Sequence, residues 1–87
     1  MSNITFSPDA WEEYLYWQIQ DRKTIKRIND LLKDIKRNGL SNGIGKPEPL
    51  KQCSAWSRRI DHANRLIYKL DDKKHILVIA CRGHYMD

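Results

Sequence analysis

The chain has 87 residues, with 16 Lys and Arg against 11 Asp and Glu, which gives a net charge of +5. This length fits one small domain, residues 1–87, with a lean core, because so short a chain buries only roughly 60% of the surface that it exposes when unfolded. Hydrophobic residues make up 40% of the chain and include three Trp and four Tyr, a composition typical of a folded protein and not of a disordered one.

No segment of the sequence is long and apolar enough to cross a membrane. The longest apolar run, Ile76–Cys81, is far shorter than the roughly 18 residues that a spanning helix needs. The opening residues Met1–Ser7 carry no Lys or Arg and no long apolar stretch, so they do not resemble a signal peptide. We therefore expect a cytoplasmic protein with no membrane partner.

The two cysteines, Cys53 and Cys81, are predicted to be free thiols, because a single pair in a cytoplasmic chain does not make a disulfide framework. Together with His62, His75 and His84 they show neither C-x-x-C nor H-x-x-x-H spacing. We therefore expect no zinc site and no other metal site.

The first half of the chain predicts a short strand and two helices. Ile4 and Phe6 alternate within the strand 3–7. Ser7-Pro8-Asp9 is typical of a helix start, because serine caps and proline suits the first helical position. The inward row of this helix is expected to contain Trp11, Leu15, Gln18 and Ile19, with Tyr14 beside it.

A second helix is predicted from an Asp21 cap to Asn38-Gly39. Its apolar residues recur every three or four positions, at Ile25, Ile28, Leu32 and Ile35, and Leu31 widens the stripe. The opposite face of this helix is charged, and such a face is more often solvated than a binding site. Its residues are Arg22, Lys23, Lys26, Arg27, Asp30, Lys33, Asp34, Lys36 and Arg37.

The second half predicts a loop over residues 39–49 and three strands, at residues 55–61, 64–70 and 75–82. Glu48 lies between Pro47 and Pro49, whose rings restrict the backbone, so its carboxylate is expected to project from a stiff extended loop. These elements predict an α+β fold, in which an N-terminal strand and a two-helix hairpin pack on one face of an antiparallel β-sheet. The other face is left open to a partner or substrate.

Basic residues concentrate in the sheet half, where residues 44–87 hold nine basic and five acidic side chains, or +4 of the net +5. Trp56 lies in the most basic stretch, which has only Glu48 and Asp61 as acids; its basic members are Lys46, Lys51, Arg58, Arg59, Arg65 and Lys69. Such a surface suits a polyanion.

Strand alternation indicates which of these side chains share the open face. Ser57, Arg59 and Asp61 point to one side of their strand, and Trp56, Arg58 and Ile60 to the other. If the last strand runs straight, one side of it carries Val78, Ala80, Arg82 and His84. Glu48, the arginines and His84-Tyr85 are then expected to meet on the open face.

These side chains suit the cutting of RNA without a metal. Glu48 can take the proton of the 2′-hydroxyl, and Arg65 with Arg59 and Lys51 can stabilise the charge that develops on phosphorus. His84 can protonate the departing 5′-oxygen, and the ring of Tyr85 can stack on a base.

Each residue also has a plainer explanation. Glu48 can pair with Lys46 or Lys51, His84 can belong to a frayed terminus, and Trp56 can be part of the core. Arg58 and Arg59 can be rim charges that hold an acidic partner protein. The residues alone therefore predict a basic sheet directed at nucleic acid, with catalysis as the less common outcome.

Four motifs follow one another along the chain: GKPEPLK at 45–51, WSRRI at 56–60, NRLIY at 64–68 and ACRGHY at 80–85. In order and spacing they resemble the YoeB branch of the RelE/ParE toxin superfamily, and the resemblance extends over both predicted helices. It implies a toxin of a type II toxin–antitoxin pair, a ribosome-dependent endoribonuclease that cuts mRNA in the ribosomal A site and thereby inhibits translation. It further implies neutralisation by an antitoxin of the YefM/Phd type, contact with operator DNA only through the antitoxin complex, and no cofactor, and it leaves a homodimer open.

The resemblance also implies roles for individual residues. Glu48 is the general base, Arg65 stabilises the scissile phosphate, His84 is the general acid, and Tyr85 positions the substrate. The remaining RNA-binding candidates are Lys51 and Arg59, which match family positions that contact the RNA backbone, together with Lys46 and Arg58.

The sequence departs from the family pattern at four places. The segment between Lys51 and Trp56 is shorter than usual, Asn64 replaces the usual histidine, and Gly83 replaces a larger residue. Met86 and Asp87 follow the pair with which members usually end. The alternative is a non-catalytic member, either a gyrase-directed ParE-like inhibitor, which lacks the Glu48–His84 pair, or a degenerate toxin that only binds its antitoxin.

Overall fold

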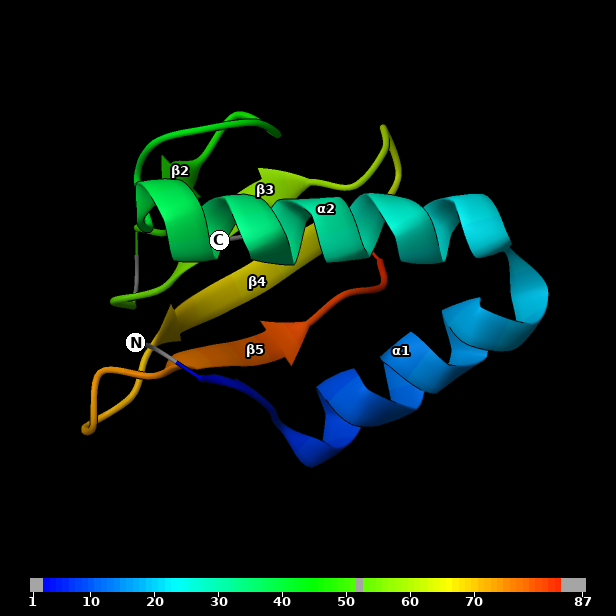
Figure 1. Ribbon diagram of the computed structural model, residues 1–87, viewed down its shortest axis with the longest axis horizontal. Coiled ribbons are helices and arrows are strands. Elements are labelled where there is room, and N and C mark those ends of the chain that lie inside the picture. Colours follow the sequence, from blue (N-terminus) through cyan, green and yellow to red (C-terminus); the bar gives the residue numbers. More distant parts are fainter. Residues whose placement is uncertain (1–2, 52, 84–87) are drawn as a thin grey trace.

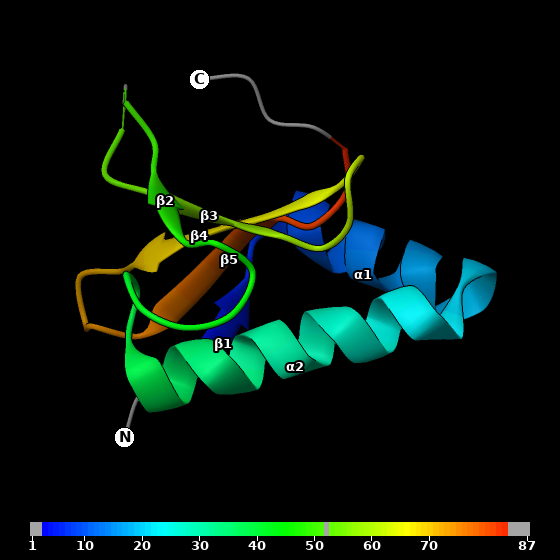
Figure 2. The same ribbon diagram turned by 90° about the horizontal axis from the view of Figure 1, so that it is seen from above.

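A computed structural model describes residues 3–51 and 53–83. Two helices and five strands follow in the order β1 (Ile4–Phe6), α1 (Pro8–Gln20), α2 (Arg22–Asn38), β2 (Glu48–Pro49), β3 (Trp56–Arg59), β4 (Arg65–Leu70) and β5 (Ile76–Ala80) (Figure 1). The strands form one sheet in the order β1-β5-β4-β3-β2, and both helices lie on the same side of it (Figure 2). The predicted α+β fold is therefore confirmed.

The sheet is mixed, because its first strand does not follow the antiparallel pattern of the rest. β1 runs parallel to β5, with Ile4 opposite Ile76, whereas the other pairs are antiparallel. β2 was predicted as part of a loop. Its two residues form a strand because Glu48 pairs with Ser57, and Pro49 is tolerated there because β2 is an edge strand.

Both helices begin where the sequence predicts, and α2 also ends there. The Ser7 hydroxyl accepts a hydrogen bond from the Ala10 N–H at 3.1 Å, and the Asp21 carboxylate accepts one from the Lys23 N–H at 3.0 Å. Gly39 ends α2 with a φ of +89° and donates its N–H to the Ile35 carbonyl at 2.9 Å. Hydrogen bonds between residues close in sequence thus determine these helix ends.

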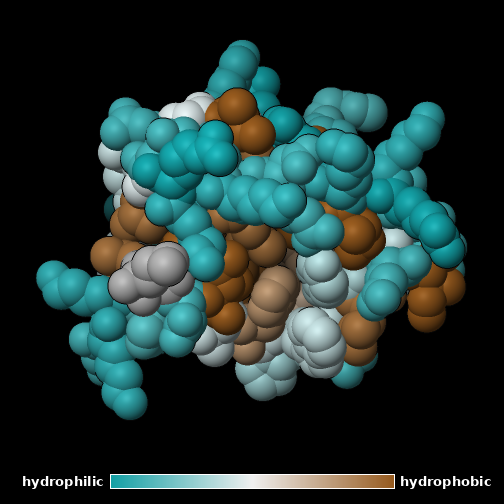
Figure 3. Space-filling view, in the orientation of Figure 1, coloured by the Kyte–Doolittle hydropathy of each residue, from teal (hydrophilic) through white to brown (hydrophobic). Residues whose placement is uncertain are grey.

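The inward face of α1 differs from the prediction, whereas that of α2 agrees with it. Ala10 is fully buried in α1 and Trp17 packs against the core, while Trp11 is 47% and Ile19 82% exposed. In α2 the buried apolar residues are Ile28, Leu31, Leu32 and Ile35. Hydrophilic side chains cover much of its outer surface (Figure 3).

The core lies between the helices and the sheet, where α2 meets Leu66, Tyr68 and Val78, all fully buried. Within the described residues, no helix has the length and apolar character to span a membrane. Both cysteines are free thiols, as predicted: Cys81 is buried and Cys53 exposed.

Candidate active site

The strand register determines which side chains occupy the sheet face opposite the helices, which we call the open face. Directly paired residues of neighbouring antiparallel strands point to the same side of a sheet. One row runs across four strands as Glu48, Ser57, Ile67 and Ala80. Arg59 and Arg65 form the adjacent pair. The structure therefore brings Glu48, Arg59 and Arg65 to one face, as predicted.

The alternation of the last strand was predicted wrongly. Tyr68 pairs with Val78 and Ile67 with Ala80, so a register irregularity inserts Ile79 between them. Val78 therefore faces the helices with Tyr68, and Ala80 faces the open side with Ile67. Ile67 is only 1% exposed, so part of this face is covered.

Glu48 is an exposed side chain on the edge strand β2. Among residues 3–51 and 53–83 the ion pairs are Lys26–Asp30 and Arg58–Asp34, so the structure does not pair Glu48 with Lys46 or Lys51. Glu48 and Arg65 are separated by two strand spacings and two residues along the strand, which corresponds to about 12 Å between their Cα atoms. That separation leaves room for a phosphodiester between the two side chains.

Arg65 is partly buried and is held by the turn that precedes it. Its Nη1 donates to the Asp61 carbonyl at 2.8 Å and to the Asn64 carbonyl at 3.3 Å. Its partner Arg59 is exposed. Two arginines paired across β3 and β4 on one face give a positive potential that favours a phosphate.

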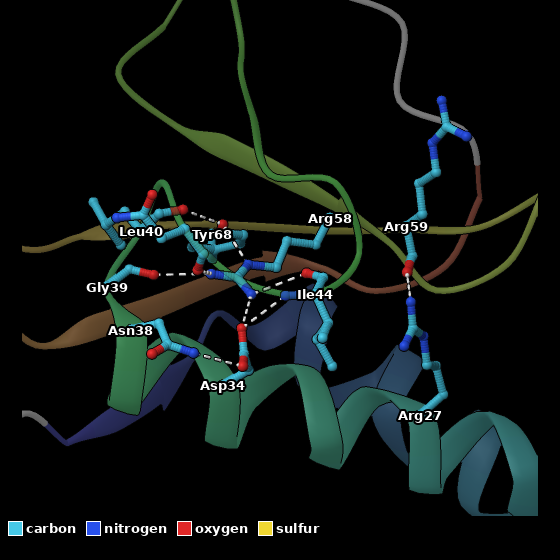
Figure 4. A network of polar contacts seen from close by, with 10 residues as sticks. Arg27, Asp34, Asn38, Gly39, Leu40, Ile44, Arg58, Arg59 and Tyr68 are labelled. Atoms are coloured by element: carbon cyan, nitrogen blue, oxygen red, sulfur yellow. Dashed lines mark hydrogen bonds and ion pairs between the residues drawn. The ribbon is translucent and has the colours of Figure 1, made fainter.

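Arg58 does not belong to this surface, and its prediction as an RNA-binding residue is wrong. Its side chain is fully buried on the helix side of β3, because alternation turns it away from Arg59. All five of its N–H groups are used within the protein (Figure 4). The acceptors are the Tyr68 hydroxyl, the Asp34 carboxylate and the carbonyls of Ile44, Gly39 and Asn42.

The buried guanidinium fastens the loop that leads to Glu48. Burial by itself raises the pKa of Asp34, but hydrogen bonds from Arg58, the Ile44 N–H and Asn38 outweigh it and lower the pKa below its usual value. Burial raises the pKa of Tyr68, whose hydroxyl donates to the Leu40 carbonyl at 2.6 Å. The loop is thus tied to α2 and β4 from inside the protein.

The remaining predicted residues occupy different surroundings. Lys46 and Lys51 are exposed at either end of the segment that contains β2. Trp56 is half-buried and packs against the core, so the plainer explanation holds for it. Arg27, which the sequence placed on a solvated face, donates to the carbonyls of Arg59 at 3.0 Å and Ile60 at 3.3 Å and so supports the end of β3.

The predicted acid His84 and the predicted ring Tyr85 lie outside the described residues. The chain can be followed to Gly83, whose N–H donates to the Asn64 Oδ1 at 2.7 Å and whose carbonyl accepts from the Arg65 N–H at 3.0 Å. The residue before His84 therefore lies beside Arg65.

Sequence reasoning missed the turn formed by residues 60–64. The Asp61 carboxylate accepts from the N–H groups of Ala63 at 2.8 Å and Asn64 at 2.7 Å. An Asp with an Asn three positions later between two strands is a turn signal that could have found it. Among residues 3–51 and 53–83, no three His, Cys, Asp or Glu side chains gather in a group that could hold a metal ion.

A family profile described as YoeB-like toxin of bacterial type II toxin-antitoxin system matches residues 6–85. The chain belongs to the YoeB-like toxin family. Toxin YoeB of Mycobacterium bovis is 46% identical over 87 residues, which cover 98% of this chain and all of that one.

Solved YoeB structures agree with the fold over almost the whole chain. The YoeB dimer from Staphylococcus aureus has a TM-score of 0.89 and 52% identity, over 97% of this chain and 98% of that one. A YoeB-YefM complex from the same organism has a TM-score of 0.88 and 52% identity, over 98% and 99% of the two chains. The predicted family is therefore confirmed, and the chain is a toxin of the type II class.

Proposed function

We propose that this YoeB-like protein is a ribosome-dependent endoribonuclease that cuts mRNA in the A site and is neutralised by a YefM-type antitoxin. The observation that carries the proposal is the open face, where exposed Glu48 shares one side of the sheet with Arg59 and Arg65. The YoeB-YefM complex among the related structures supports an antitoxin partner, and the YoeB dimer supports self-association.

The proposed reaction is an internal transesterification. Glu48 takes the proton of the 2′-hydroxyl, and the 2′-oxygen forms a bond to phosphorus while the bond to the 5′-oxygen breaks. Arg65, with Arg59 beside it, stabilises the negative charge that develops on the phosphoryl oxygens. His84 gives its proton to the 5′-oxygen, so the products are a 2′,3′-cyclic phosphate and a 5′-hydroxyl.

The remaining residues bind and position the RNA. Lys46 and Lys51 are exposed on either side of Glu48 and would contact phosphates, which fixes orientation without reading the sequence. Tyr85 would stack on a base beside the cut. The roles of His84 and Tyr85 are taken from the family resemblance. The reaction uses side chains alone, and cleavage is expected to persist in excess EDTA on ribosomes kept intact by a polyamine.

The experiment is primer extension on mRNA in a translating extract, with the wild-type protein and Glu48→Gln. The wild type is expected to produce cuts at A-site codons, and Glu48→Gln to lower the rate by roughly 10² to 10⁴-fold. Lys69→Gln is the control, since it removes a half-buried positive charge from the same side of β4 as Arg65, outside the proposed machinery, and is expected to keep the wild-type rate. Absence of ribosome-dependent cuts by the wild type would leave an antitoxin-binding module as the function.

A further inference from the structure

The two residues that follow β5, Cys81 and Arg82, are fastened to α1. The Cys81 N–H donates to the Glu13 carboxylate at 2.8 Å, and the Cys81 carbonyl accepts from the Trp17 indole at 2.8 Å. The Arg82 guanidinium lies 3.7 Å from the centroid of the Tyr16 ring, a close cation–π contact. Two consecutive residues are thus held from the helix side.

The next residue, Gly83, is held from the opposite direction by the turn between β3 and β4. Asn64 binds its N–H through Oδ1 at 2.7 Å, and the Arg65 N–H binds its carbonyl at 3.0 Å. Gly83 has a φ of +91°, a left-handed conformation that favours glycine, and a Cβ there would meet no atom within 4 Å. Backbone conformation, and not lack of space, therefore favours glycine at this position.

The side chain of Asn64 has its orientation fixed by Asp61. Its Nδ2 donates to the two Asp61 carboxylate oxygens at 3.1 and 3.2 Å, which turns Oδ1 toward Gly83. Burial by itself raises the pKa of Asp61, but the N–H of Ala63 and the groups of Asn64 outweigh it and hold the pKa below its usual value. The carboxylate is therefore ionised at neutral pH, and its hydrogen bonds are charge-assisted.

We infer that Asn64 is a positioning residue for the C-terminal general acid. Oriented by Asp61, it fixes the peptide of Gly83, the residue that precedes His84 in the sequence. The same turn holds Nη1 of Arg65 through the Asp61 carbonyl, so one short segment holds both the phosphate-stabilising group and the peptide of Gly83. The inference rests on the proposed function and adds to it a residue at which this chain departs from the usual histidine.

A leaving-group experiment separates positioning of the acid from general damage. Asn64→Leu is compared with the wild type in single-turnover cleavage of ribosome-bound mRNA, once with a natural 5′-oxygen and once with a 5′-thio leaving group at the cut. A thiolate departs without a proton, so a defect that acts through the acid disappears with the thio substrate. Asn42→Leu makes the same change in an exposed loop residue and serves as the control.

Asn64→Leu is expected to cut the natural substrate roughly 10 to 100-fold more slowly, as for a displacement of about 1 Å in a catalytic group, and the thio substrate within about threefold of the wild type. His84→Ala is expected to show the same pattern and Glu48→Gln a loss with both substrates. Equal rates for Asn64→Leu and the wild type on the natural substrate, or an equal loss on both substrates, would overturn the inference. A wild type that cuts neither substrate would contradict the proposed function itself.

An exchange of side chains keeps the test valid if Asn64→Leu unfolds. Asn64→Asp keeps an acceptor for the Gly83 N–H but sets a second carboxylate against Asp61, and is expected to lose activity on the natural substrate. Asp61→Asn combined with Asn64→Asp restores one donor between the two side chains and is expected to regain most of it. Amide hydrogen exchange at Gly83 should rise in the single variant and fall back in the double one. If the double variant is no better than the single one by either readout, the inference is wrong.

Discussion

Arg58→Lys is predicted to destabilise the protein strongly although it keeps the charge. The guanidinium is fully buried and makes five hydrogen bonds, to the Tyr68 hydroxyl at 2.8 Å, to the Asp34 carboxylate and to three loop carbonyls at 2.7 to 3.0 Å. An ammonium group has three donors and no planar fork, so at least two of the five acceptors lose their hydrogen bond.

The size of the effect follows from those lost partners. Each lost hydrogen bond of a charged group costs about 1.5–3 kcal/mol, so two give about 3–6 kcal/mol. The whole free energy of unfolding for a domain of this length is roughly 4–13 kcal/mol. The variant is therefore expected to lose a large fraction of its stability and to melt roughly 12–48 °C lower, at about 4–8 °C per kcal/mol.

Arg59→Lys is the matched control, because it is the same chemical change at the next residue, which is exposed on the open face. It is expected to change the free energy of unfolding by no more than about 0.5 kcal/mol. Urea unfolding followed by circular dichroism measures both variants. If the free energies of unfolding of Arg58→Lys and Arg59→Lys lie within about 0.5 kcal/mol of each other, the buried network does not stabilise the loop.

Three further predictions concern the same groups and the site. Burial and the Glu13 carboxylate raise the pKa of Cys81 to about 12, so a thiol reagent at pH 8 should label exposed Cys53 and leave Cys81 unlabelled until unfolding; labelling of both in the native state would contradict this. The lowered pKa of Asp34 means that its contribution to stability is complete above the ordinary carboxyl pKa, about 3.9, and is lost as the pH falls through the folded-state value. The difference in unfolding free energy between the wild type and Asp34→Asn should therefore be constant near neutral pH and shrink in acid, and a constant difference down to pH 2 would refute it. Arg65→Ala should lower the single-turnover cleavage rate at saturating ribosomes far more than it weakens ribosome binding, whereas a loss confined to affinity would assign Arg65 to docking.

Features that depend on neighbouring residues could be predicted from the sequence. Ser7, Asp21 and Gly39 fix the helix ends through bonds to residues at most four positions away, so their signal is complete in the sequence. The apolar stripe of α2 could also be predicted, because its apolar residues recur every three or four positions on one side of the helix. Placement of Arg59 and Arg65 on one face followed from strand alternation, whereas Glu48 was predicted to project from a loop and reaches that face because β2 pairs with β3.

Features that depend on distant partners could not be predicted. Arg58 was assigned to the surface by residue type, and its burial depends on loop carbonyls that become acceptors only in the folded chain. Ala10 gives a weak hydrophobic signal, yet it is fully buried and its carbonyl accepts from the Cys81 thiol at 3.6 Å, so the more hydrophobic row of Trp11 and Ile19 was preferred wrongly. The bulge at Ile79 exists only in the pairing of β4 with β5.

The nature of the cut ends tests the central claim most directly. With Glu48 as base and His84 as acid, the nucleophile is the adjacent 2′-hydroxyl, so the upstream fragment should carry a 2′,3′-cyclic phosphate or 3′-phosphate and the downstream fragment a 5′-hydroxyl. A single 2′-deoxy nucleotide at the cut position should abolish cleavage of ribosome-bound mRNA without preventing binding, because phosphate contacts do not need the 2′-oxygen. Cleavage of the deoxy substrate, or a 5′-phosphate on the downstream fragment, would contradict the mechanism.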